Sequence, residues 1–178
     1  MSTTDIAWMS ATDLVAAYRA RRLSPVEVTQ AVLGRLERLN PVLNAFCLSD
    51  PAAALESARA SEARWSKGQP LGLVDGVPVS VKDIIVTKGW PTLRGSRTVD
   101  PNQPWEEDGP AVARLREQGA VLFGKTTTPE FAAKAVTRSP LTGTTLNPWD
   151  TSRTPGGSSG GAGAAIAAGI GPMALATD

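Results

Sequence analysis

This chain is organised around the stretch Thr154-Pro-Gly-Gly-Ser-Ser-Gly-Gly-Ala-Gly163. Five of the eight residues from 156 to 163 are glycine, and two adjacent serines lie among them. Because glycine lacks a Cβ, this segment can approach another backbone or a ligand closely. Small apolar residues follow as far as Gly169, which predicts a helix whose first N–H groups point back at the serines. A flexible glycine-serine linker is the alternative, but linkers are usually polar on both sides.

Composition limits the chemistry that this chain can perform. Its 178 residues, 42% of them hydrophobic, can bury a substantial core, and this length fits one domain. A net charge of +1 provides no field for nucleic acid or for an anionic membrane. The single cysteine, Cys47, excludes an internal disulfide and a thiolate-rich metal site. Histidine is absent, so acid–base chemistry must come from Lys, Asp, Glu, Tyr or Cys.

The two ends of the sequence bear on its location in the cell. The segment Met1–Ile6 lacks a basic region followed by an apolar core, so we predict no signal peptide and expect a cytoplasmic protein. Residues 154–177 carry no charge, but they are mostly Gly, Ala, Ser and Pro and are interrupted by Pro172. A buried helix and strand therefore fit this segment better than a membrane span.

Residues 1–70 read as a helical region that serves as scaffold. Capping boxes at Ser10–Asp13 and Ser24–Glu27 predict the starts of two helices. The second helix is expected to end at Asn40-Pro41. Asp50-Pro51 opens a third, alanine-rich helix.

Residues 71–178 read as an α/β region. Alternating valines predict a strand within 77–86, and a loop-like stretch rich in proline follows. A helix is expected over 110–119 and a short strand over 120–124. A further buried strand is expected over 172–177. The order of strands and helices indicates an α/β layer architecture.

Two motifs suggest other classes of protein. Gly119–Thr126 satisfies the pattern of a phosphate-binding loop, so a P-loop nucleotide-binding module is one alternative. The residues between its glycines are strand-like, however, which favours a strand and turn with an incidental Gly-Lys pair. Gly156–Gly160 satisfies the nucleophile-elbow pattern of α/β-hydrolases, but that site needs a histidine base, and this sequence has none.

Lys82 is the candidate base. Most lysines in proteins are exposed, so the simplest interpretation of Lys82 is an exposed strand residue. Its neighbours from Val79 to Val86 are largely apolar, which predicts a buried amine with a lowered pKa. Asp83 should point to the opposite face of the strand and so not meet Lys82.

Four motifs in order closely resemble the amidase signature family. They are Gly76–Asp83, Gly124–Phe131, Asn147–Asp150 and Pro155–Gly161. The resemblance implies a mixed central sheet flanked by helices and the hydrolysis of a small-molecule carboxylic amide to acid and ammonia or amine. It also implies no metal and no organic cofactor.

The resemblance assigns roles to four residues. Lys82 matches the base of the family's Ser–Ser–Lys triad, and Ser158 matches the bridging serine, which follows a cis peptide bond. Ser159 matches a position that supplies supporting hydrogen bonds. Ala132 matches a position that lines the acyl pocket.

One departure from the family pattern concerns the nucleophile. The matching serine would fall four positions beyond Asp178, together with the turn that forms the oxyanion hole. We therefore expect an N-terminal fragment of a longer protein. One alternative is a genuine short product, which would be inactive as an amidase and would expose sheet edges. Another alternative is a non-catalytic interaction fragment.

Within the family, the runner-up is the amidase subunit of a tRNA-dependent amidotransferase. That branch usually carries a methionine–glycine pair where this chain has Phe131-Ala-Ala-Lys134. The difference favours a stand-alone amidase.

Overall fold

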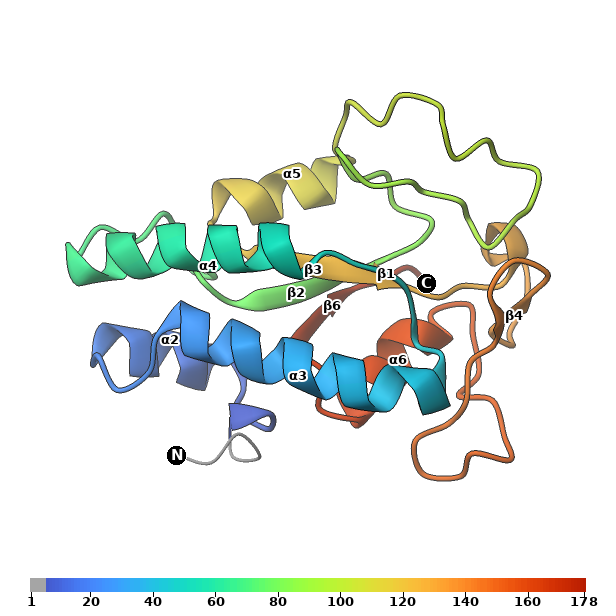
Figure 1. Cartoon of the computed structure of the whole chain (residues 1–178), viewed down its shortest axis with the longest axis horizontal. Coiled ribbons are helices and arrows are strands. Elements are labelled where there is room, and N and C mark those ends of the chain that lie inside the picture. The colour runs from blue at the N-terminus through green and yellow to red at the C-terminus, as the bar shows by residue number, and fades with distance from the viewer. Residues whose placement is uncertain (1–5) are drawn as a thin grey trace.

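The computed structural model describes residues 6–178, which build a mixed four-stranded sheet with helices on both faces (Figure 1). The strand order is β1 (Phe46–Ser49), β3 (Val121–Thr126), β2 (Pro78–Lys82) and β6 (Met173–Leu175). β1 runs antiparallel to β3, whereas β2 is parallel to both β3 and β6. The predicted mixed α/β architecture is confirmed.

Apolar clusters cover both faces of the sheet. On one face, residues of α3 (Pro25–Leu43), α4 (Pro51–Ser66) and α6 (Gly160–Ala167) pack with Val121 and Phe123. On the other, Val112 of α5 (Pro110–Glu117) packs with strand residues that include Leu122. Figure 1 shows α5 on the opposite side of the sheet from α3 and α6. β2 is buried along its whole length because both faces are covered.

The predicted helix starts are confirmed. Ser10 caps α2 (Ala11–Arg19) by accepting a hydrogen bond from the backbone N–H of Asp13. Ser24 and Glu27 form the capping box of α3. α4 begins after Asp50, whose side chain accepts from the N–H of Ala53.

The predicted end of α3 at Asn40-Pro41 is wrong, because the helix continues to Leu43. Pro41 lies in the last turn, where its missing N–H removes one bond only and packing outweighs that loss. The helix ends instead at Asn44, which adopts a left-handed conformation with φ 49°. The Asn40 carboxamide then accepts hydrogen bonds from the N–H groups of Ala45 and Phe46 and so directs the chain into β1.

The remaining elements follow the expected order with smaller differences. A 3₁₀ turn (η1, Glu130–Ala132) follows β3, and a short hairpin pairs β4 (Arg138–Ser139) with β5 (Gly143–Thr144). β6 is shorter than expected and only half-buried, because it lies at an edge of the sheet. Within residues 6–178, none of the helices combines the length and apolar character that crossing a membrane would require.

Glycines let α6 approach the sheet. A Cβ placed on Gly161 would lie 2.5 Å from the backbone N of Thr127 and 2.6 Å from the carbonyl oxygen of Ala45. Gly163, two residues further along the same helix, has open space around its Cα. Of these two residues, only Gly161 is therefore required to be glycine by packing.

We expect Gly161→Ala to lower the free energy of unfolding by about 1–3 kcal/mol, because rigid backbone must move to admit the methyl group. Gly163→Ala is the matched control and should raise it by about 0.5–1 kcal/mol, because alanine is the better helix former. Urea denaturation of both variants measures the difference. Equal effects of the two substitutions would contradict the close approach of α6.

Candidate active site

Lys82 is the last residue of β2, and its side chain is completely buried. The backbone turns sharply after it, because the N–H groups of Ile84 and Ile85 both donate to the Lys82 carbonyl, at 2.8 and 3.0 Å. The exposed-lysine interpretation of this residue is therefore wrong. The amine reaches the side of the sheet on which α6 begins.

Three hydroxyl groups surround the Lys82 amine. Its Nζ lies 2.7 Å from Ser158 Oγ, 2.9 Å from Ser159 Oγ and 2.7 Å from Thr177 Oγ1. Ser159 Oγ also donates to the Thr177 carbonyl at 2.8 Å, which fastens the segment after β6 to the start of α6. The three oxygens match the three N–H donors of a lysine ammonium. Among the described residues, no carboxylate forms a salt bridge with this amine.

The glycine loop places the two serines at the N-terminus of α6. Ser159 is the residue before the helix, and the Gly157–Ser158 peptide bond is cis, as the family resemblance predicts. Thr137 Oγ1 donates to the Gly156 carbonyl at 2.8 Å and accepts from the Gly160 N–H at 3.0 Å. One threonine therefore fixes the backbone on both sides of the serine pair.

Burial lowers the pKa of Lys82, because the charged ammonium loses its water. Asp83 does not offset this loss, since its carboxylate lies beside Lys125. A neutral amine keeps two N–H donors and gains one lone pair, so it can accept a proton from a neighbouring hydroxyl. The cluster can therefore act as a base without histidine.

The structure brings three of the four predicted site residues together: Lys82, Ser158 and Ser159. Ala132 lies in η1 and belongs to the segment after Thr128, whose hydroxyl donates to the Ser158 carbonyl at 3.3 Å. Its role in an acyl pocket stays a prediction. Ala132 and its neighbour Phe131 both have positive φ, 57° and 50°, a conformation that is uncommon for these residue types.

Sequence reasoning missed two functional contacts. The local pattern around Thr177 predicts only a strand, and nothing in it shows that the side chain reaches Lys82. Thr137 lies in an irregular segment with no motif of its own. Thr177 and Thr137 both make contacts that form only when distant segments of the chain meet. Covariation between the contacting positions is the signal that could have indicated these contacts.

The P-loop pattern does not form a phosphate cradle. Val121–Thr126 is a buried strand, as the strand interpretation predicted, and no helix begins at Lys125. The Lys125 amine is buried and donates to the Ile85 carbonyl at 3.1 Å. It is therefore not free to bind a nucleotide.

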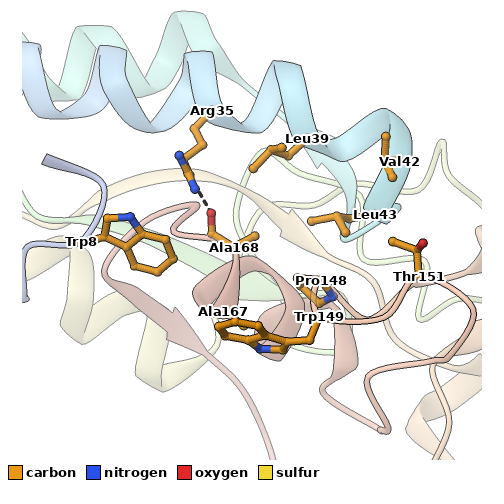
Figure 2. A pocket seen from close by; sticks show the side chains of 10 residues that line it. All are labelled: Trp8, Arg35, Leu39, Val42, Leu43, Pro148, Trp149, Thr151, Ala167 and Ala168. Carbon is orange, nitrogen blue, oxygen red and sulfur yellow. Dashed lines mark hydrogen bonds between the residues drawn. The ribbon is translucent and has the colours of Figure 1, made fainter. Parts of the chain in front are cut away.

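An apolar cleft of about 390 Å³ lies apart from the lysine cluster (Figure 2). It is lined by side chains of α3 such as Leu39 and by Trp149, and Arg35 crosses it to donate to the Ala168 carbonyl at 2.6 Å. None of the lysine-cluster residues lines it. We place the candidate active site at Lys82, because reactive groups meet there and not in the cleft.

Comparisons with known proteins identify the family of this chain. Residues 27–178 match the family described as Amidase. Indoleacetamide hydrolase from Bradyrhizobium diazoefficiens is 43% identical over 95% of this chain and 32% of that protein. A glutamyl-tRNA(Gln) amidotransferase subunit from Acidothermus cellulolyticus is 42% identical over 98% of this chain and 34% of that protein.

Solved structures share the fold. A crystal structure of an amidase superposes with a TM-score of 0.88 at 37% identity, covering 96% of this chain and 38% of that one. Fatty acid amide hydrolase superposes with a TM-score of 0.93 at 27% identity, covering 99% of this chain and 31% of that one. The fold is that of the amidase signature enzymes. The chain belongs to the amidase family, and it spans about a third of the length of the curated relatives that it matches.

The lowered pKa of Lys82 predicts how stability changes with pH. Between that lowered pKa and the ordinary lysine pKa, the unfolded chain binds more protons at this site, so stability rises with pH. We expect the unfolding free energy of the wild-type chain to increase relative to Lys82→Met as the pH rises through this window. Urea denaturation at a series of alkaline pH values measures it.

Taking the difference between two chains cancels the other titrating groups. Lys67→Met removes an exposed lysine and is the matched control for the loss of one lysine. A Lys82→Met difference that does not change with pH would contradict desolvation of the Lys82 amine.

Proposed function

We propose that residues 1–178 form the amino-terminal part of one amidase domain and that the whole protein hydrolyses a small-molecule carboxylic amide to an acid and ammonia or an amine. One observation carries this proposal. A buried lysine amine with a lowered pKa lies 2.7 Å from the hydroxyl of Ser158 and has hydroxyl partners instead of a carboxylate.

In the proposed mechanism, neutral Lys82 is the base and Ser158 relays protons. The nucleophilic serine gives its proton to Ser158 Oγ while the Ser158 proton passes to Lys82 Nζ. The serine oxygen attacks the amide carbon, and the proton returns by the same route to the leaving amine. By the family resemblance, the nucleophile and the oxyanion hole lie beyond Asp178.

Ser159 and Thr177 have a supporting role in this proposal. Their hydroxyl oxygens lie 2.9 and 2.7 Å from Lys82 Nζ, so they orient the amine toward Ser158. Ala132 would line the acyl pocket. The expected cytoplasmic location remains part of the proposal.

A second candidate is the amidase subunit of a tRNA-dependent amidotransferase. The relative named as a glutamyl-tRNA(Gln) amidotransferase subunit is 42% identical, and indoleacetamide hydrolase is 43% identical, so overall identity does not separate the two functions. Phe131-Ala-Ala-Lys134, in place of that branch's methionine–glycine pair, favours the stand-alone amidase. Hydrolysis of simple amides without partner chains would support the first candidate, and activity that requires tRNA and partner proteins would support the second.

We expect the 178-residue chain alone not to hydrolyse simple amides, and a longer product that carries the matching serine to do so. In that product, Lys82→Ala and Ser158→Ala should each lower kcat/KM by at least about 10²-fold, because each removes a proton-transfer group. Release of ammonia or amine measures the rate.

Exposed residues of the same types are the controls. Lys67→Ala and Ser152→Ala should leave kcat/KM unchanged. Turnover that survives both Lys82→Ala and Ser158→Ala would defeat the assignment.

A further inference from the structure

A second buried charged cluster lies on the face of the sheet opposite the Lys82 amine. Lys125 is completely buried, and its Nζ lies 3.2 Å from Oδ1 of Asp83, whose side chain is 3% exposed. The same amine donates to the Ile85 carbonyl at 3.1 Å and to the Thr92 hydroxyl. The proposed amide hydrolysis uses none of these groups.

The Asp83 carboxylate is also held by a backbone loop. Its Oδ2 lies 3.4 Å from the backbone N of Gly95, and the N–H of Leu93 is a further donor. Arg94 and Gly95 have φ of 59° and 64°, so the loop is left-handed at these two residues. The carboxylate therefore joins β3, through Lys125, to the loop over 93–95.

The burial of this ion pair is weak evidence for a stabilising role. Burial raises the pKa of Asp83 and lowers the pKa of Lys125, because each charge loses its water, and their mutual attraction opposes both shifts. Buried ion pairs are often no more stabilising than apolar residues of similar size. What this pair supplies is a fixed geometry with several anchor points.

We propose that Asp83 and Lys125 are positioning residues that hold the Lys82 amine against Ser158. The first connection runs through the turn after β2. Asp83 directly follows Lys82, and the Lys82 carbonyl accepts from the N–H of Ile85, whose own carbonyl accepts from Lys125. Lys125 thus fixes both ends of the turn that sets the direction of the Lys82 side chain.

The second connection runs to Ser158. The loop at Gly95 lies so close to the segment after β3 that a Cβ there would be 2.7 Å from the Thr128 carbonyl oxygen. The hydroxyl of Thr128 in turn donates to the Ser158 carbonyl. Both sides of the Lys82–Ser158 contact are therefore tied to one ion pair. The inference rests on the proposed function only in treating Lys82 as the base.

Competitive acetylation of the folded chain tests the proposal without requiring turnover. The ratio of the acetylation rate of Lys82 to that of exposed Lys67 is measured by mass spectrometry at limiting reagent. In the wild-type chain we expect a low ratio, because Lys82 is buried and makes three hydrogen bonds. Thr92→Val removes one acceptor of Lys125 with almost no change in shape, and it should raise the ratio about fivefold or more. Lys125→Met removes the whole anchor and should raise it further.

Asp75→Asn is the matched control. Asp75 is completely buried and pairs with Arg64 at 2.6 Å, so its loss also breaks a buried ion pair, but at the other end of β2. It should lower the urea midpoint while the Lys82 ratio stays at its wild-type value.

Two outcomes would overturn the proposal: an unchanged ratio in folded Thr92→Val, or an equal rise in Asp75→Asn. If Lys125→Met does not fold, the acetylation ratio of the Thr92→Val chain tests the proposal by itself. Because labelling needs no catalysis, a chain that passes this test and yet lacks amidase activity in its longer form would contradict the proposed function alone.

Discussion

The structure depends on one constraint, the burial of a lysine amine among hydroxyl groups. An ammonium removed from water without a carboxylate partner is costly, and part of that cost is met by shifting the amine toward its neutral form. The hydroxyls of Ser158, Ser159 and Thr177 can all accept from the ammonium, and around the neutral amine two can accept while a third donates to the lone pair, so they solvate the amine without restoring its charge. A carboxylate in their place would have raised the pKa and removed the base.

The surrounding fold makes this arrangement possible. β2 is buried on both faces, so the side chain of Lys82 at its end lies in a site from which water is excluded. The glycines at the start of α6 let that helix contact the backbone around Ala45 and Thr127, which brings the serine pair to the end of the strand. The N-terminal helices complete the apolar core on one face of the sheet, where residues of α3 pack with residues of β3.

Much of this could be predicted from the sequence because local signals agreed with the final packing. The caps at Ser10 and Ser24 mark helix starts through bonds within four residues, and the alternating valines mark the strand β2. The Lys82–Ser158 pairing came from the ordered family motifs. Thr177 and the end of α3 could not be predicted, because the first depends on a segment 95 residues away and the second on packing that outweighs Pro41.

The separation of these partners along the chain has a consequence for how the protein acquires its site. Lys82 precedes Ser158 by 76 residues and Thr177 by 95, so their contacts carry a loop-closure entropy, and we expect them to form late in folding. Through the earlier steps the lysine is an ordinary hydrated cation. The free-energy cost of stripping its water thus falls on the docking of α6 and β6, and this cost decreases as the pH rises and the amine loses its proton.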